Sequence, residues 1–495
     1  MLLLWPIFQM IRFLQILYVH LRQNLDKMSP KLLNILLAFV PAVSVPAMPA
    51  DTLSLERCLE IALSDNPTVR IADMEVERVD YSRREALGAL LPTVSFDGSY
   101  TRTLQKQVAY MDMDAFGDMM PPEGDESGAA GESSRRGGGN TDGFKMGLDN
   151  AWSAGFSASV PLIAPQLWQS LKLSDTNIAR AAEQARASRL DLVNQVKSAY
   201  YALLLAHDTR RTVQESYDMA SLTHSIYEKR HSAGDASEYD VLRTSVAMKN
   251  VEPEIIQADI AVRRAHLQLA ILMGLSADTP FEVQGTLADY ESDMYAETLS
   301  LSDDLSNNTS LISNTIETSA LRRQLSMQRS SFLPTLALSA NYMWNSSSNG
   351  SPFRNFRWSP YSIVGVTLSI PIIQGGQRWS RVRQARIALD EMAYTRDNLT
   401  RQLSSQVALS HDNIRLNVKQ IASSRESVDE ASRAHDIQQR SFDIGAASYL
   451  DLRDSELSLT RARLGYYQAV YNYLIASSEL ELLLGNAPID KYTRK

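Results

Sequence analysis

Two short segments of this 495-residue chain place a carboxylate beside a position where the chain can reverse. In each, a glycine is followed by a serine three residues later and an aspartate six residues later: Gly234, Ser237 and Asp240, then Gly445, Ser448 and Asp451. Glycine adopts the positive φ that ends a helix, and serine caps the next helix through its hydroxyl. An aspartate in the first turn faces the positive end of the helix dipole. Capping therefore accounts for these residue types without any catalytic role.

Other reactive residues are few or scattered. Cys58 is the only cysteine, which excludes an intramolecular disulfide and a cysteine cluster for a metal. The seven histidines show no metal-ligand spacing, and the chain has neither a phosphate-binding glycine loop nor a GxSxG nucleophile elbow. The sequence predicts no enzyme, no cofactor and no metal site.

Composition and charge exclude further classes. The net charge of −8 argues against a nucleic-acid partner, because such binding rests on Lys and Arg neutralising phosphates. Mean hydropathy is −0.21, and no run of about 20 apolar residues follows residue 50. Near the N-terminus, Lys31 precedes an apolar stretch over 32–45 and small residues up to Ala50. This pattern predicts an upstream segment and signal peptide over 1–50, with the mature chain starting at about 48–51; a retained membrane anchor is the alternative.

The rest of the chain contains one unit twice. Asn66 and Leu91-Pro92-Thr93 recur 242 residues later, at Asn308 and Leu333-Pro334-Thr335. Later landmarks recur after 210 or 211 residues: Val160-Pro161-Leu162 at Ile370-Pro371-Ile372, Gly234 at Gly445, and Leu272-Met273-Gly274 at Leu483-Leu484-Gly485. The drop from 242 to 210 places about 32 extra residues between Pro92 and Pro161, and the nearly constant offset beyond them indicates an internal repeat. We expect a first structural repeat over 51–290 and a second over 291–495.

Each repeat begins with a helical stretch, over about 53–88 and 299–330, and continues into alternating segments. Period-two alternation predicts hairpin strands at about 92–103 and 151–161 in the first repeat, and 334–345 and 361–371 in the second. One face carries aromatic residues and the other small polar ones, as in a membrane barrel wall. Half-buried soluble hairpins would give the same alternation.

A Gly-, Asp-, Met- and Ser-rich insertion over 104–150 separates the first two strands. It contains Met111-Asp112-Met113-Asp114 and Met119-Met120. Methionine thioethers can bind Cu(I), but the Gly and Asp content favours a flexible acidic loop.

Long helices follow the strands. Neither Gly nor Pro occurs over 166–233 or over 377–444, which predicts two helices of about 65 residues, each ~100 Å long. A second helical stretch of about 40 residues follows each turn. Apolar residues such as Val193, Val196, Tyr200 and Leu203 recur at three- and four-residue steps, giving a coiled-coil-like stripe. Helices this long form rods or the staves of a tube.

The doubled set of Gly turns, Leu-Pro-Thr strand openings and prolines after the returning strands resembles the TolC-type outer membrane efflux family over about residues 51–488. The resemblance implies a mainly α fold with a membrane β part: a trimer whose long helices form a periplasmic α-barrel. Four strands per chain would build a 12-stranded barrel in outer membrane lipid. Four strands cannot close a barrel alone, and lipid allows no open edge.

The resemblance also implies roles for the turns. Gly234, Ser237, Gly445 and Ser448 would lie at a periplasmic tip that docks an adaptor protein. Asp451 and Asp454 would ring a constriction there, with Asp240 in the matching place of the first repeat. Several relatives lock this tip with an Arg two residues after the Gly and a Tyr three residues before it. Here Ala447 and Phe442 stand at those places, so Arg243, the repeat equivalent of Asp454, is proposed as a substitute partner.

Two hypotheses follow. The first is a passive outer membrane exit channel of a tripartite efflux pump or type I secretion system, working with an adaptor and an inner membrane transporter. The alternative is a soluble periplasmic coiled-coil scaffold protein.

Overall fold

The computed structural model describes residues 52–109, 144–291, 294, 303–351, 357–487 and 489–492. The predicted signal peptide and the methionine clusters lie outside these residues. One compact unit contains Ser54–Thr279 and Val283–Lys495, so the two repeats are not separate domains. Of a second, small unit the structure describes Thr52, Leu53 and Pro280–Glu282. Here β1 (Thr52–Leu53) forms a two-stranded sheet with β6 (Glu282–Val283).

The main sheet has four strands: β2 (Thr93–Arg102), β5 (Asn150–Ile163), β7 (Thr335–Ser348) and β8 (Ser359–Ser369). They are antiparallel in the order β2-β5-β7-β8, so the β5–β7 pair joins the two repeats. Within the segment predicted as a loop, β3 (Gln107–Ala109) pairs with β4 (Phe144–Met146), and β5 already begins at Asn150.

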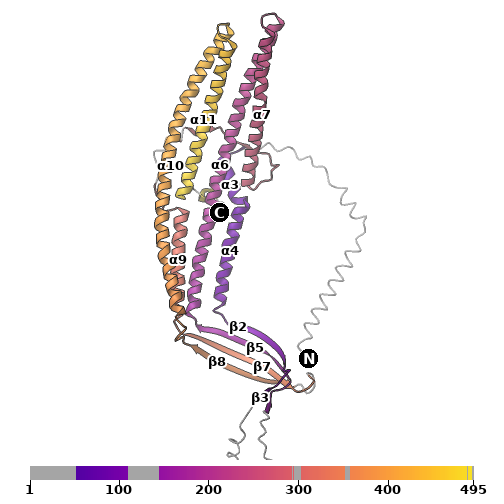
Figure 1. Cartoon of the computed structure of the whole chain (residues 1–495), viewed down its shortest axis with the longest axis vertical. Helices are drawn as coiled ribbons and strands as arrows, with labels where there is room; N and C mark the ends of the chain where they lie inside the picture. The colour runs from indigo at the N-terminus through magenta and orange to yellow at the C-terminus, as the bar shows by residue number, and fades with distance from the viewer. Residues whose placement is uncertain are drawn as a thin grey trace, which may run out of the picture. The chain divides into compact units, whose positions relative to one another are not determined.

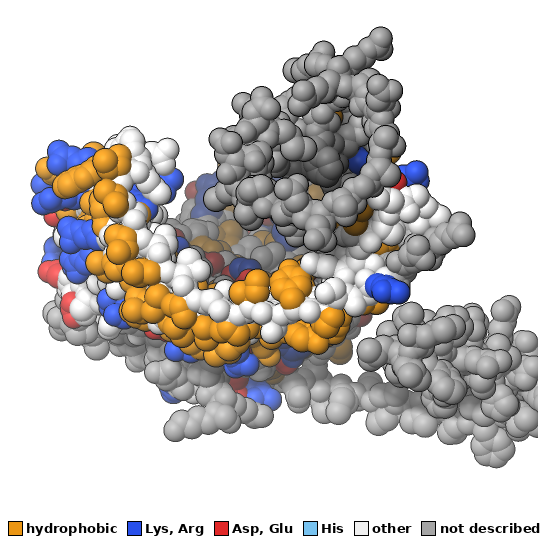
Figure 2. All heavy atoms as spheres, turned by 90° about the horizontal axis from the view of Figure 1, so that it is seen from below, with side chains coloured by type: hydrophobic (Ala, Val, Ile, Leu, Met, Phe, Trp, Pro, Cys, Tyr) orange, Lys and Arg blue, Asp and Glu red, His pale blue; other side chains and the backbone are white. Residues whose placement is uncertain are grey.

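The two faces of this sheet differ in chemistry. On one face Phe96 lies against Phe156, with ring centroids 5.0 Å apart, and Tyr100 lies against Trp152 at 4.3 Å. On the other face, hydroxyls pair across the same two strands, Thr93 with Ser159 at 2.9 Å and Ser99 with Ser153 at 2.7 Å. Viewed from the sheet end, the molecule presents a curved band with hydrophobic side chains along its outer side (Figure 2).

Four long helices continue from the strands in two hairpins (Figure 1). The first hairpin consists of α6 (Pro165–Ser232, 68 residues) and α7 (Glu238–Leu272, 35 residues). The second consists of α10 (Gln377–Asp443, 67 residues) and α11 (Tyr449–Leu484, 36 residues). These helices and the four strands confirm the predicted fold class. Among the described residues, no helix is both long and apolar enough to cross a membrane.

The shorter helices correct the prediction at two places. The expected helix over 53–88 is broken into α3 (Leu55–Asp65) and α4 (Pro67–Gly88), because the Asn66 side chain caps α4 and proline occupies its first turn. In the second repeat α9 (Thr309–Ser330) begins only after the cap residue Asn308. A 3₁₀ turn, η1 (Leu287–Tyr290), and α12 (Ile489–Tyr492) complete the described elements.

The helices form one layer in which α6 has neighbours on both sides. Near the sheet the order of neighbours is α4, α6, α9, α10, and nearer the hairpin turns it is α7, α6, α11, α10. The predicted apolar stripe on α6 is buried inside this layer: Val193, Val196, Tyr200 and Leu203 are each at most 1% exposed. The elements at the two edges of the layer, α4 and α7 on one side and α10 on the other, come from different repeats.

The repeated landmarks correspond to one repeated contact. The Asn66 amide donates to the Leu272 carbonyl at 2.7 Å, and the Asn308 amide donates to the Leu483 carbonyl at 2.6 Å. Each asparagine also accepts a backbone N–H at the start of the next helix. The bonds of each asparagine form what we call an asparagine bracket. Each bracket fixes the end of the returning helix, α7 or α11, to the start of α4 or α9 in the same repeat.

Candidate functional site at the helix tips

The two hairpin turns have the same backbone geometry. Gly234 has φ +86° and Gly445 has φ +75°, the left-handed region that favours glycine. In the first turn, the Asp235 N–H donates to the Arg230 carbonyl at 2.8 Å. In the second, the Ala446 N–H donates to the Ser441 carbonyl at 2.8 Å. These are the expected C-terminal caps of α6 and α10.

Both returning helices begin with a complete capping box. The Ser237 hydroxyl accepts from the Asp240 N–H and donates to the Asp240 carboxylate at 2.7 Å. The Ser448 hydroxyl does the same with Asp451, at 2.6 Å to the carboxylate. These bonds to Ser448 lower the pKa of the Asp451 carboxyl. The cap predicted from sequence is confirmed, and both aspartates are engaged in it within a single chain.

The remaining carboxylate of the predicted constriction, Asp454, is exposed on α11 one turn beyond the cap. Among the described residues it has no ion pair, and Arg243 does not contact it. Instead the Arg243 guanidinium lies 4.8 Å from the centroid of the Tyr449 ring. Within one chain, therefore, the proposed Arg243–Asp454 pair is replaced by a cation–π contact with the first residue of α11.

Arg243 belongs to a larger group at the tips, the tip cluster, composed of Tyr227, Arg230, Arg243, Phe442 and Tyr449. Arg230 lies 5.8 Å from the Tyr227 ring centroid and 5.6 Å from that of Phe442. The Tyr227 ring is 6.3 Å from Phe442 and 5.7 Å from Tyr449, edge-on to the latter. Phe442 is only 5% exposed. The cluster joins α6 and α7 to α10 and α11.

Sequence reasoning identified Arg243 and Phe442 but missed Tyr227, Arg230 and Tyr449. The repeat offset of 211 relates these three to Gln438, Ser441 and Glu238, so the repeat gave no signal. What these three residues share is that each lies within two helical turns of Gly234 or Gly445, where the chain reverses. Such proximity is visible in the sequence, but the contact across hairpins is not.

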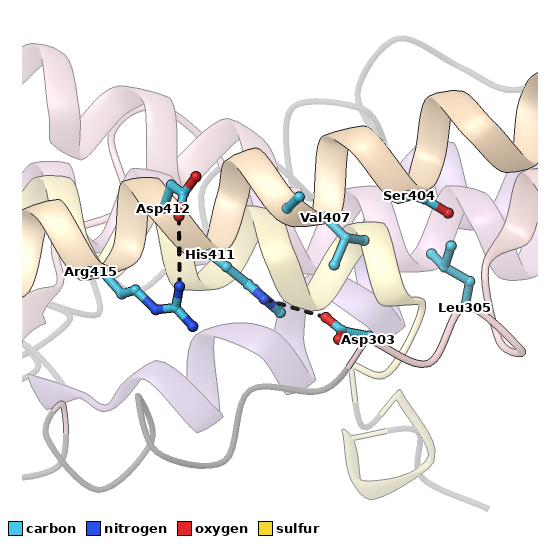
Figure 3. A pocket seen from close by; sticks show the side chains of 8 residues that line it. Asp303, Leu305, Ser404, Val407, His411, Asp412 and Arg415 are labelled. Atoms are coloured by element: carbon cyan, nitrogen blue, oxygen red, sulfur yellow. Dashed lines mark ion pairs between the residues drawn. The ribbon is translucent and has the colours of Figure 1, made fainter.

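A second polar group lies beside α10, far along the chain from the turns. His411, Asp412 and Arg415 line a pocket of about 380 Å³ with Asp303 and Leu305 (Figure 3). The His411 Nδ1 lies 3.3 Å from the Asp303 carboxylate, and Arg415 lies 3.7 Å from Asp412. The His411 Nε2 is buried without a hydrogen-bond partner in the described part of the chain. The pocket is open to solvent and shares no residue with the tip cluster.

Chemistry elsewhere is limited. The described residues contain no group of three or more His, Cys, Asp or Glu side chains placed to hold a metal ion. Burial raises the pKa of the Cys58 thiol to about 12, so this residue is a protonated part of the α3 core. The tips thus hold the main candidate site, and its groups can cap helices, attract cations and join hairpins.

Proteins with related sequences include a metal resistance protein and an outer membrane protein, and those with related structures include an outer membrane channel. The chain is 26% identical over 315 residues to the cobalt-zinc-cadmium resistance protein CzcC of Cupriavidus metallidurans, which covers 62% of this chain and 71% of CzcC. It is 22% identical over 347 residues to the outer membrane protein TolC of Vibrio cholerae, covering 67% and 76%. The solved CmeC outer membrane channel of Campylobacter jejuni has the same fold, with a TM-score of 0.65, 15% identity and 88% of each chain covered.

The family assignment rests on both repeats. The family model described as "Outer membrane efflux protein" matches residues 58–275 and residues 300–486. The gap between the matches, 276–299, contains the boundary at 290 that was expected between the two repeats. The two matches together cover well over half of the chain, with both hairpin turns inside them. The chain belongs to the outer membrane efflux protein family and is an outer membrane protein whose helices extend into the periplasm.

Proposed function

We propose that the chain is one protomer of a homotrimeric exit channel, the outer membrane component of a tripartite efflux pump or type I secretion system. The proposal rests on one observation. In a single chain, the main sheet and the helical layer each end in edges that have no neighbouring strand or helix among the described residues. The channel is a passive conduit, gated at its helical tips.

The first open edge belongs to the sheet. Among the described strands of the main sheet, β2 and β8 each pair on one side only. Hydrocarbon cannot satisfy unpaired backbone groups, so a sheet that crosses a bilayer must close. Pairing β8 of one copy with β2 of the next closes the sheet with four strands from each of three copies. The aromatic face then meets lipid, and the serine and threonine face lines the lumen.

The second open edge belongs to the helices. Exposed apolar residues follow the edge helices at helical spacing. These residues are Ile71, Met74 and Tyr81 on α4; Leu242, Val246, Ile256 and Ile260 on α7; and Ile387, Tyr394, Leu409, Leu416 and Ile437 on α10. Stripes of this kind are the seams of coiled coils. A head-to-tail contact of α10 with α4 and α7 of the next copy buries both stripes and closes a ring.

At the tips, the proposed ring of three copies brings carboxylates close together. Asp451 and Asp454 of three copies supply six carboxylates around the aperture, with Asp240 of the first hairpin beside them. A ring of carboxylates attracts cations at a pore entrance. We assign Phe442 and Arg243 to holding the aperture, through the contacts described above.

The turns themselves fit a docking role. The turns at Gly234 and Ser237, and at Gly445 and Ser448, are flanked by exposed apolar side chains. Tyr239 is 69% exposed, Ile444 82% and Leu450 63%. Apolar groups at the free end of a rod mark a site for a protein partner. The proposed partner is a periplasmic adaptor that links the tips to an inner membrane transporter and splays them, so that solute diffuses through the lumen.

The test combines size, conductance and two variants. The detergent-solubilised protein should have the mass of three chains and should conduct ions in a planar bilayer. Leu242→Asp and Ile437→Asp place a charge in the proposed seams and should abolish the trimer. Leu222→Asp is the matched control, because Leu222 is 64% exposed on α6, which is not an edge helix. A monomer that is extracted without detergent and does not conduct would favour the soluble scaffold instead.

A further inference from the structure

We infer that six exposed arginines at the sheet end of α9 and α10 form a basic collar, which binds the anionic headgroups of phospholipids in the periplasmic leaflet of the outer membrane. The collar consists of Arg322, Arg323 and Arg329 on α9, and Arg381, Arg383 and Arg386 on α10. The inference rests on the proposed function, because it takes the sheet to cross the membrane, and it adds a ligand to that function.

The collar belongs to a segment of unusual charge. Residues 318–389 contain nine arginines and no lysine, aspartate or glutamate, in a chain whose net charge is −8. The acids that bound the segment are Glu317, which is paired with Arg180, and Asp390. In the part of the chain that the structure describes, none of the six collar arginines forms an ion pair. These guanidinium groups are therefore available to an anion from outside the chain.

The collar lies directly beside the part of the sheet that is proposed to cross the bilayer. Strand β8 has 11 residues, and a tilted strand needs about 9–11 residues to cross the hydrocarbon core. Helix α9 ends at Ser330 just before β7, and α10 begins at Gln377 just after β8. All six arginines lie within about 14 Å of these helix ends. Their long side chains can reach back to the headgroup level.

Apolar side chains mark the same boundary. Ile372 and Ile373, between β8 and α10, and Trp379, in the first turn of α10, are exposed. The Trp379 ring lies 6.1 Å from that of Phe332, and the Arg378 guanidinium lies 5.9 Å from the same Phe332 ring. Tryptophan is enriched where a membrane meets water. In the view from the sheet end, Lys and Arg side chains gather just beyond the hydrophobic outer side of the band (Figure 2), which is the proposed lipid side.

The first repeat shows that the fold does not require these charges. Trp379 has a repeat equivalent in Trp168, 211 residues earlier, and both junctions lead from the sheet into a long helix. The three α10 arginines of the collar correspond to Ser170, Lys172 and Asp175. Arginine binds phosphate through paired N–H groups, and basic clusters at a membrane surface bind anionic lipids. Phosphate binding explains why the arginines accumulate at this junction.

A neighbouring copy of the chain would supply too few carboxylates to neutralise the collar. Helix α4 is proposed to meet α10 of the next copy. Its Asp73, Glu75 and Asp80 already pair with arginines of their own chain. Of the acids on α4, only Glu77 and Glu85 form no ion pair among the described residues. Two carboxylates do not balance six guanidinium groups, and α9 is not an edge helix.

The test is lipid binding to the purified trimer, measured by native mass spectrometry. The probes are phosphatidylglycerol, phosphatidylcholine of the same chain length and inorganic phosphate. The unaltered protein should bind phosphatidylglycerol in preference to the other two. Arg383→Gln combined with Arg386→Gln should weaken this binding by about fivefold for each arginine lost. Arg396→Gln combined with Arg401→Gln is the matched control, because it removes the same charge from α10 at about 28 Å or more from its sheet end.

Equal binding of phosphatidylglycerol by the two double variants would overturn the collar, and so would inorganic phosphate that competes as well as the lipid. Should the Arg383 and Arg386 variant fail to assemble, Arg322→Gln combined with Arg323→Gln makes the same comparison on α9. A conducting trimer whose lipid binding is the same in all variants refutes the collar alone. A protein that forms no conducting trimer refutes the proposed function, so the two failures are distinguishable.

Discussion

Each helical hairpin has a glycine at both ends, and the two glycines are required for different reasons. One end is the tip, where the chain reverses, and the other is the base, where α7 or α11 ends. At the tips, Gly234 and Gly445 have positive φ, and a side chain added at either would meet nothing within 4 Å. At the base, Gly274 and Gly485 also have positive φ, but both abut backbone. A Cβ on Gly274 would lie 2.9 Å from the Asp65 carbonyl oxygen, and one on Gly485 would overlap that of Asn307.

The base of each hairpin is therefore closely packed against other backbone, whereas the turn at its tip is not. The base is enclosed by the asparagine brackets at Asn66 and Asn308, both of which are buried. The tips are held by caps within each turn and by the tip cluster between hairpins. The channel proposed above would open at its tips, and it needs this arrangement because the base must keep its packing while the hairpins move. The predictions below test the contrast in order of decreasing effect.

Gly485→Ala should have the largest effect, because it combines left-handed strain with overlap on a backbone carbonyl. We expect a loss of about 3 kcal/mol or more. Gly274→Ala should cost less, since its nearest atom is farther away. Thermal denaturation of the purified protein, in its proposed trimeric form, gives the measurement. Gly465→Ala, within the helix that Gly485 caps, is the control, because a Cβ there meets nothing within 4 Å. Equal melting temperatures for Gly485→Ala and Gly465→Ala would contradict the fixed base.

Asn308→Ala should follow, at about 2 kcal/mol, because it removes a buried donor to Leu483 and the cap of α9. Asn66→Ala should cost about the same, since it makes the same two bonds in the first repeat. Asn417→Ala, which removes one long and exposed bond to Asn472 at 3.4 Å, is the comparison. Heat stability of the three trimers is the readout. If Asn417→Ala is as harmful as the other two, the brackets do not anchor the base.

Gly445→Ala should cost only about 1 kcal/mol, because left-handed strain is its sole penalty. The effect should stay local. Amide hydrogen exchange should rise around the turn, over about 441–452, while the melting temperature of the trimer stays close to that of the unaltered protein. Gly234→Ala should behave alike in the first hairpin. A fall in melting temperature as large as that of Gly485→Ala would remove the distinction between tip and base.

Local patterns in the sequence predicted much of the fold. Long stretches without Gly or Pro gave α6 and α10 within a residue or two, and the serine and aspartate after each turn gave the caps. Both features depend on residues near one another in the chain. The break at Asn66 was missed although Asn66-Pro67 is a helix-start signal, because the apolar pattern of α3 and α4 continues across it.

The contacts between hairpins could not be predicted in the same way. Arg243 was expected near Asp454 because the repeat relates the two positions. In the folded chain its neighbour is Tyr449, because the packing of the two hairpins brings the start of α7 close to the start of α11, and no repeat offset relates these two residues. Tyr227 and Arg230 were missed for the same reason. Sequence periodicity predicts each helix and its turn, whereas the contact between hairpins depends on their register in space.

The smallest predicted effect is that of low pH on the capping box of the second hairpin turn. Hydrogen bonds from Ser448 lower the pKa of Asp451 below its ordinary value of 3.8. A carboxyl whose pKa is lower in the folded state stabilises that state fully above its unfolded pKa, and this contribution is lost as the pH falls through the folded value. The cap of α11 should therefore be intact above about pH 4 and weaken progressively below it. Hydrogen exchange of the Asp451 amide, corrected for the intrinsic rate at each pH, follows this change. Asp451→Asn keeps the shape of the side chain without the titration, so its protection should not vary over the same range. A variant whose protection still falls with the same pH profile would mean that another group controls the turn, and the free end of the second hairpin would then be coupled to residues beyond its own cap.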